Sequence, residues 1–379
     1  MLRRIFLTFL MLFAFACLLH AVVPETLDVG IYQDQKITGV VMIPAAGIYR
    51  LYDSQNNVIC ELSLHESLLV EPLGDHLSLS WGDTTVYVRG EVMLKGLRWE
   101  NFFIVRPEGI PYRIYDDDLI IRPGFGQLTL VNRVAIEKYI AGVVQSESGW
   151  NRHPAFYEVQ AIIARTYALR NQRNNGHHGF DLCDGVHCQA YYGRTAYEHI
   201  IAAVDLTRGD VVVDADNRLI NAVYHANCGG ETVNSEHVWQ QAESYLKGVV
   251  DPHCVGQPGY AWEASLTQDQ LFRFLESNYG LVPNATQRQQ ILTFTQHNRL
   301  HTLRPFQQVS LRFIRTAFNF RSTFFSFSPF NEKIFVQGRG YGHGVGLCQE
   351  GAMEMAKKGY DRGEIIDFYY RNVRLLNLD

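Results

Sequence analysis

Apolar and polar side chains alternate in short runs from about residue 22 to residue 135. Glycine, aspartate and asparagine separate these runs, a pattern typical of β-strands joined in hairpins. The clearest runs are Lys36 to Ile43, Val58 to Leu64, Thr85 to Val92 and Leu128 to Val131. The first part of the chain is therefore predicted to be rich in β-strands.

The hydrophobic period changes near residue 134. Val134 to Val144 has helical spacing, and Pro154 occupies the first position of a second helix, where proline is favoured. Gly176 ends this second helix. Its apolar face is formed by Phe156, Val159, Ile163 and Tyr167.

Helices and strands mix in the rest of the chain. The predicted helices are Tyr197 to Gly209, Ser265 to Tyr279, Leu347 to Lys358 and Asp361 to Tyr370. The predicted strands are Asp210 to Val213, Leu219 to His225 and the aromatic stretch that ends at Phe330. This order predicts an α+β fold, with a β-rich N-terminal part followed by a domain of mixed helices and strands.

The N-terminus has the layout of a secretory signal peptide. Arg3 and Arg4 precede an apolar run from Ile5 to Leu19, and we predict cleavage after Ala21. Lipidation at Cys17, after a poor lipobox, is the alternative. A permanent anchor is less favoured because about 15 apolar residues are short for a bilayer, and no later stretch is long enough to span one. The mature protein is thus predicted to be exported, periplasmic or associated with the cell wall.

Composition excludes several classes of protein. With 34 basic and 39 acidic side chains the formal net charge is -5, which gives no electrostatic footprint for nucleic acid. The hydrophobic fraction of 47% excludes intrinsic disorder. Export permits disulfides among the six cysteines that remain after signal removal.

Glu147 is the candidate catalytic acid. It follows a predicted helix and lies between two apolar elements, so partial burial would favour its neutral form. A neutral carboxyl group is suited to general acid catalysis near neutral pH. The alternative is a glutamate at a helix end that interacts only with the helix dipole.

Cysteine and histidine side chains gather between residues 177 and 188. Thiolates and imidazoles are the ligands that Zn²⁺ prefers. His177, Cys183 and Cys188 are the preferred ligands, with His187, His178 or water as the fourth. A disulfide between Cys183 and Cys188 is the alternative, which leaves the histidines unexplained.

Glycine occupies every second position from Gly338 to Gly346. In an extended chain alternate residues share a face, so Arg339, Tyr341 and His343 would project together as candidate substrate-binding residues. A dinucleotide-binding loop is rejected because the third glycine of its fingerprint is missing at the required offset. A glycine-rich packing strand is the structural alternative.

Cys228 and Cys254 form a candidate disulfide. A bridge across this 26-residue separation would stabilise the chain by roughly 3 to 4 kcal/mol. Free buried thiols are the alternative.

Several of these segments together resemble the SpoIID/LytB family, that is, stage II sporulation protein D and the amidase enhancers. The most specific stretches are Ala164-Arg165-Thr166-Tyr167-Ala168 and Gly342-His343-Gly344-Val345-Gly346, the latter followed by Cys348-Gln349-Glu350-Gly351-Ala352. The resemblance covers roughly residues 110–262 and 332–379. It divides the mature chain into a β-rich domain at 22–109 and a catalytic domain at 110–379 with a weakly matched segment at 263–331.

The resemblance implies a lytic transglycosylase that acts on peptidoglycan glycan strands without stem peptides. It places the catalytic acid/base at Glu147 and a zinc ion, of mainly structural role, at His177, Cys183 and Cys188. One departure is Gln145-Ser146-Glu147-Ser148, where the family commonly has Pro-x-Glu-Met. The competing classes are a non-catalytic wall-binding enhancer of an amidase and a metallohydrolase in which zinc activates water.

Overall fold

A computed structural model of the chain describes residues 25–172, 178–239 and 241–379. The predicted signal peptide, with Cys17, lies outside these ranges.

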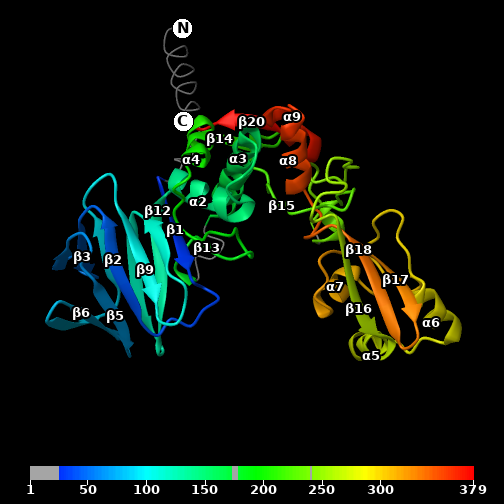
Figure 1. Cartoon of the computed structure of the whole chain (residues 1–379), viewed down its shortest axis with the longest axis horizontal. Coiled ribbons are helices and arrows are strands. Elements are labelled where there is room, and N and C mark those ends of the chain that lie inside the picture. Colours follow the sequence, from blue (N-terminus) through cyan, green and yellow to red (C-terminus); the bar gives the residue numbers. More distant parts are fainter. Residues whose placement is uncertain (1–24, 173–177, 240) are drawn as a thin grey trace, which may run out of the picture.

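Two sheets with mostly antiparallel pairing form the N-terminal part of the molecule (Figure 1). The seven-stranded sheet has, in spatial order, β13 (Leu182–Cys183), β1 (Thr26–Ile31), β12 (Gln127–Ala135), β11 (Asp118–Gly124), β8 (Val92–Gly96), β3 (Tyr49–Asp53) and β4 (Val58–Leu62). The six-stranded sheet has β10 (Arg113–Asp116), β9 (Phe102–Pro107), β2 (Val40–Ala46), β5 (Leu68–Leu73), β6 (His76–Trp81) and β7 (Thr84–Arg89).

Side-chain alternation explains how these strands pack. In β6, Leu77 and Leu79 are buried while the residues between and beside them are partly exposed, as expected for a strand with one face on a core. Tyr49 and Phe103, from opposite sheets, meet edge to face with ring centroids 5.5 Å apart. Both sheets continue beyond residue 109, because β10, β11 and β12 add strands to them as far as Ala135.

A group of helices follows the sheets, as Figure 1 shows. Its helices are α2 (Ile136–Ser148), α3 (Pro154–Asn171), α4 (Glu198–Leu206), α8 (Gln349–Lys357) and α9 (Arg362–Tyr369), with the 3-10 turn η2 at Ser235–His237. Helix α3 is buried on most sides, so it forms the centre of this part. Two short strand pairs join distant segments: β14 (Asp210–Val213) with β20 (Arg374–Asn377), and β15 (Tyr224–His225) with β19 (Leu347–Cys348).

The weakly matched segment forms a unit with its own core. Its elements are β16 (Ala261–Thr267), α5 (Gln268–Tyr279), α6 (Ala285–Leu292), α7 (Leu311–Ala317), β17 (Phe324–Phe330) and β18 (Lys333–Arg339). Trp262, Leu271, Phe325 and Phe327 are buried within it. Figure 1 shows the unit at the opposite end of the molecule from the two large sheets.

Two predictions for this segment were wrong. The aromatic stretch from residue 280 to Phe330 was predicted as strand, and β17 confirms this only for its last part. The rest contains α6 and α7, which are too short to establish a helical period and are set by their caps. Asn284 caps α6 through a capping box with Gln287. The helix predicted from Ser265 begins at Gln268, because Ala261–Thr267 is strand β16.

The mixed composition of helices and strands confirms the α+β class. None of the helices within the described ranges is long and apolar enough to cross a bilayer.

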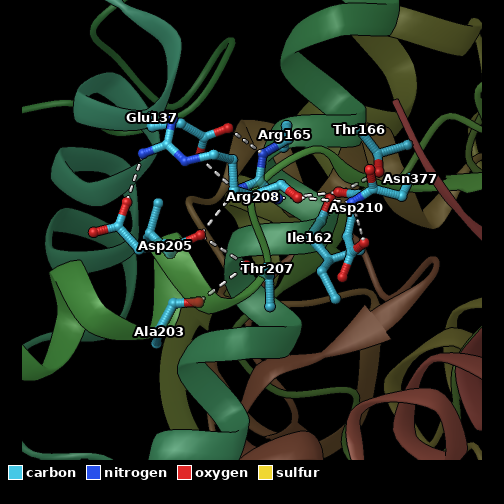
Figure 2. A network of polar contacts seen from close by, with 11 residues as sticks. Glu137, Ile162, Arg165, Thr166, Ala203, Asp205, Thr207, Arg208, Asp210 and Asn377 are labelled. Atoms are coloured by element: carbon cyan, nitrogen blue, oxygen red, sulfur yellow. Dashed lines mark hydrogen bonds and ion pairs between the residues drawn. The ribbon is translucent and has the colours of Figure 1, made fainter. Parts of the chain in front are cut away.

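A buried arginine in α3 pairs with a glutamate in α2 and also contacts β14 (Figure 2). Arg165 of α3 is 1% exposed, and its Nε donates to Glu137 Oε1 of α2 at 2.9 Å. Its Nη1 donates to the Asp210 carbonyl oxygen at 3.0 Å. Thr166, the next residue, donates to the Ile162 carbonyl and accepts from the Val212 amide at 2.9 Å. The Ala164-Arg165-Thr166-Tyr167-Ala168 stretch thus fixes α3 against two other elements.

We expect Arg165→Leu to lower the free energy of unfolding by roughly 3 to 5 kcal/mol, because it leaves the Glu137 carboxylate without its buried partner. The matched control is Arg273→Leu, which removes a 76% exposed guanidinium paired with Asp269 and should cost below about 1 kcal/mol. Urea unfolding followed by circular dichroism measures both. Equal destabilisation by the two variants would contradict the role of Arg165.

Candidate active site

A cleft of about 640 Å³ lies where the end of α2, the 182–193 loop, β15 and the glycine-rich segment meet. The residues that line it are drawn from a stretch between Glu147 and Gln349, and several of them are predicted site residues. They are Glu147, Tyr167, Val186, His187, Cys188, Val223, Tyr224, His225, Ala226, Trp239, Arg315, Tyr341, Gly342, His343 and Gln349. Among these described lining residues, Glu147 is the only acid.

Glu147 lies in the last turn of α2, where Gly149 ends the helix at φ 71°. A carboxylate at a helix C-terminus is not stabilised by the dipole, so the dipole alternative does not account for its position. Burial raises the pKa of Glu147 above its ordinary value of 4.5, and two hydrogen bonds, from the Ala190 amide and the Tyr224 hydroxyl, partly oppose this shift. Burial of the carboxyl group therefore favours its protonated form.

A hydrogen-bond network holds the glutamate. The Ala190 amide donates to Glu147 Oε1 at 2.7 Å. Behind it, the buried Gln189 side chain donates to the Tyr224 hydroxyl at 3.2 Å and accepts from the Tyr139 hydroxyl at 3.3 Å. The orientation of the carboxyl group thus depends on the loop that carries Gln189 and Ala190.

That loop is attached to the N-terminal sheet. Strand β13 pairs in parallel with β1, placing Cys183 opposite Gly30. Asp184, 4% exposed, accepts from the Tyr32 amide at 2.7 Å and forms an ion pair with Arg113 at 2.7 Å. The acid next to the predicted metal ligands is therefore an anchor for the loop.

Three of the predicted zinc ligands converge. The Cys183 and Cys188 sulfurs are 3.0 Å apart, and His187 Nδ1 lies 3.9 Å and 3.7 Å from them. Tetrahedral zinc with two thiolates and an imidazole requires separations of roughly 3.5 to 3.8 Å, so the donor set fits the ion after a small spread of the sulfurs. His177 lies outside the described residues. His178 stacks on Phe180, with ring centroids 5.8 Å apart.

The glycine-rich segment is extended only as far as Arg339, where β18 ends, so its predicted shared face is not formed. Glycines 340, 342, 344 and 346 all have positive φ. Gly342, at φ 114°, approaches β15 so closely that a Cβ atom there would lie 2.7 Å from the Cβ of His225. Beyond Arg339 the alternation of glycine reflects a tightly turned backbone rather than a strand.

The three candidate substrate-binding residues consequently separate. Tyr341, 50% exposed, and His343 line the cleft. Arg339 points elsewhere: its guanidinium lies 3.9 Å from the Phe324 ring centroid and donates to the His297 carbonyl at 3.1 Å. A different basic residue, Arg315 of α7, lines the cleft.

Both ring nitrogens of His343 are engaged by the backbone. The Val345 amide donates to Nδ1 at 3.1 Å, so Nε2 carries the hydrogen and donates to the Tyr224 carbonyl at 2.9 Å. Loss of water lowers the pKa of His343 to about 4, so the ring is neutral at physiological pH. His343 thus connects the glycine-rich segment to β15.

Sequence reasoning gave no role to Tyr224 or His225, although both lie in the stretch Tyr224 to Gly230 that carried the resemblance. His225 is 5% exposed, pairs through Nδ1 with the Val345 carbonyl at 3.1 Å, and leaves a buried Nε2 without a partner beside the cleft. Trp239 and Arg315 were also missed, because their sequence neighbourhoods contain no motif. Tyr167 lies within the Ala164 to Ala168 motif but was assigned only to the apolar face of its helix.

Cys228 and Cys254, predicted as a disulfide, are free thiols with sulfurs 3.3 Å apart. The buried side chains of Cys348 and Asp251 lie beside them, so the pair is part of a larger cluster.

Comparison with known proteins agrees with this arrangement. A family model described as Stage II sporulation protein matches residues 125–213, which include Glu147 and the 182–193 loop. An uncharacterized protein of Brachyspira hyodysenteriae is 28% identical over 348 residues, covering 87% of this chain and 88% of that protein. Stage II sporulation protein D of Bacillus subtilis is 29% identical over 271 residues, covering 66% of this chain and 76% of that protein.

The amidase enhancer of Bacillus subtilis is 26% identical over 277 residues, which cover 59% of this chain and 39% of that longer protein. The family model spans the motif around Arg165, and the named relatives are of the two kinds that the sequence motifs resemble. These matches support membership of the chain in the SpoIID/LytB family.

Proposed function

We propose that the protein is a peptidoglycan lytic transglycosylase that cleaves the bond between N-acetylmuramic acid and N-acetylglucosamine in peptide-free glycan strands. The observation that supports this most directly is Glu147, whose pKa is raised and which is the one carboxyl group among the described residues that line a cleft of about 640 Å³. A retaining or inverting hydrolase uses two carboxyl groups, whereas intramolecular transfer requires one.

In the proposed reaction the protonated Glu147 donates its proton to the bridging oxygen as the bond from that oxygen to the muramyl C1 breaks. The resulting carboxylate takes the proton of the muramyl 6-hydroxyl group. The oxygen of that hydroxyl group forms the new bond to C1. The products are a 1,6-anhydro end and a free hydroxyl on the leaving sugar, and no water is consumed. The Ala190 amide, 2.7 Å from Oε1, keeps the carboxyl group oriented through both steps.

Aromatic and basic side chains in the same cleft suit a sugar that carries a carboxylate. Tyr341 and Trp239 offer ring faces for sugars, and Arg315 offers a positive charge for the lactyl carboxylate. We assign the charge contact to Arg315 rather than Arg339, whose guanidinium is directed toward Phe324.

Zinc at Cys183, His187 and Cys188, with His177 as the proposed fourth ligand, would order the loop beside the glutamate. The chemistry that the ion would supply is a structural cross-link between thiolate and imidazole ligands. The residues of this chain that act on the glycan would remain Glu147 and its hydrogen-bond partners.

A non-catalytic amidase enhancer is the second candidate function, and the named relative in Bacillus subtilis favours it. It predicts binding of glycan and of an amidase without turnover by this chain. The Glu147 experiment below separates the two functions.

We expect Glu147→Gln to reduce glycan cleavage by about 10² to 10⁴, because amide replacement removes the proton donor. Wild type and variant are incubated with peptide-free glycan strands, and the products are weighed by mass spectrometry. Wild type should yield anhydro products. The matched control is Glu158→Gln, which alters a glutamate paired with Arg362 at 3.2 Å outside the cleft and should retain activity.

Products one water heavier would indicate a hydrolase. Equal activity of wild type and Glu147→Gln would remove Glu147 from the mechanism, and inactivity of both would favour the enhancer.

The pH profile of wild type is a second measurement. A general acid acts while protonated, so kcat/KM should fall as pH rises through a pKa above the ordinary 4.5.

The raised pKa of Glu147 also determines how the stability of the folded protein changes with pH. Stability from the protonated form is complete below the unfolded pKa and is lost as pH rises through the folded value. Glu147→Gln should therefore gain thermal stability relative to wild type as pH increases.

We expect Cys183→Ser to lose one zinc ion per chain and to lower the melting temperature, since metal binding contributes folding energy. Elemental analysis measures the zinc, and Cys60→Ser, a cysteine on β4, is the matched control. Metal-free wild type with Cys183 bridged to Cys188 would contradict this site.

A wall substrate requires export, which the N-terminal segment predicts. N-terminal sequencing of the mature protein should begin at Val22, or at a lipidated Cys17. A cytosolic chain that still begins at Met1 would contradict export.

A further inference from the structure

Four buried side chains with metal-ligating atoms meet beside the paired strands β15 and β19. They are Cys228, Asp251, Cys254 and Cys348, each 0% exposed, and their ligand atoms all lie within 4.8 Å of one another. They come from three segments: the turn after β15, the loop at 251–254, and the end of β19, where Cys348 precedes α8. None of them belongs to the cleft lining or to the Cys183 site.

The separations suit one small ion. Cys228 Sγ lies 3.3 Å from Cys254 Sγ and 3.3 Å from Asp251 Oδ2. The edges of a tetrahedral zinc site with sulfur and oxygen ligands are roughly 3.5 to 3.8 Å, so small side-chain shifts are enough to admit the ion.

Asp251 is a buried carboxylate whose hydrogen-bond partners are uncharged. The His253 amide donates to Oδ1 at 2.9 Å, and the Tyr369 hydroxyl donates to Oδ2 at 3.0 Å. A buried carboxylate without a cation is costly, and a divalent ion would compensate it.

The backbone around the sulfurs is arranged for thiolates. The Cys228 amide donates to Cys348 Sγ at 3.2 Å, and the Gly230 amide donates to Cys254 Sγ at 3.2 Å. Gly230 has φ 98°, a conformation that glycine adopts without strain, and this turn places its amide at the sulfur. Such amide hydrogen bonds commonly support metal-bound ligands.

A positively charged side chain lies beside the cluster. Arg299, 9% exposed, donates from Nη2 to the Cys228 carbonyl at 2.6 Å. Its guanidinium would offset part of the net negative charge that three thiolates and a carboxylate leave around a divalent ion.

A disulfide explains the cluster less completely. Any bridge uses two of the three cysteines and leaves the third thiol and the Asp251 carboxylate buried together. We infer that Cys228, Asp251, Cys254 and Cys348 bind a second zinc ion. Four buried protein ligands leave no open position, so the site is structural.

This ion would support the cleft wall opposite Glu147. Cys348 lies in β19, which pairs with β15 so that His225 is opposite Cys348. The ion would tie β15, the 251–254 loop and the start of α8 into one unit, fixing Tyr224 and His225.

The test is a zinc count on full-length protein purified without added metal or reductant. Wild type should contain two zinc ions per chain by elemental analysis and native mass spectrometry. Cys348→Ser should lose one ion and keep the other, Cys183→Ser should lose the other, and Cys60→Ser should keep both. If the Cys183 site binds no metal, wild type contains one ion and only Cys348→Ser loses it, so the two sites are tested separately.

A second measurement requires no variant. Wild type is denatured with a chelator and an alkylating agent but no reductant, and its peptides are mapped. Alkylation of all three cysteines together with the second zinc ion supports the site. A Cys228–Cys254 bridge, or zinc in Cys348→Ser equal to that of wild type, would overturn it.

Discussion

The position of the Glu147 carboxyl group depends on how the loop after α3 is held. This loop pairs with β1 through β13, and Asp184 fixes it further by accepting from the Tyr32 amide and pairing with Arg113. The sheet thereby determines where the Ala190 amide lies, 2.7 Å from Glu147 Oε1. A partly buried carboxyl group is useful as an acid only if it is also oriented, and the β-rich domain supplies that orientation.

The cleft has two walls that differ in origin. The end of α2 and the 182–193 loop form one wall, and both lie within the span of the family model at 125–213. The other wall consists of β15 and the glycine-rich segment, which His343 joins through its contact with the Tyr224 carbonyl. Arg315 of α7 also lines the cleft, so the unit formed by β16 to β18 contributes a residue to it. Substrate contact on both walls is what the proposed reaction requires.

Sequence patterns predicted the strands and the long helices well, because alternation and helical period report local burial. They also selected Glu147, Cys183, His187, Cys188, Tyr341 and His343, whose side chains lie in or beside one cleft. They failed where long-range contacts decide the backbone. Gly342 has φ 114° because it packs against His225, which no local pattern reveals. For the same reason Arg339 was grouped with Tyr341, and Asp251 and Cys348 were not joined to Cys228.

In the proposed reaction a glycan strand lies across this cleft with its scissile bond at Glu147. The most direct measurement is a crystal structure of Glu147→Gln with a bound peptide-free glycan oligomer. The account predicts the bridging oxygen within about 3 Å of the residue 147 side chain, as proton transfer requires, with Tyr341 and Arg315 in contact with the sugars. A glycan bound away from the cleft, or with residue 147 out of reach of the bridging oxygen, would contradict it.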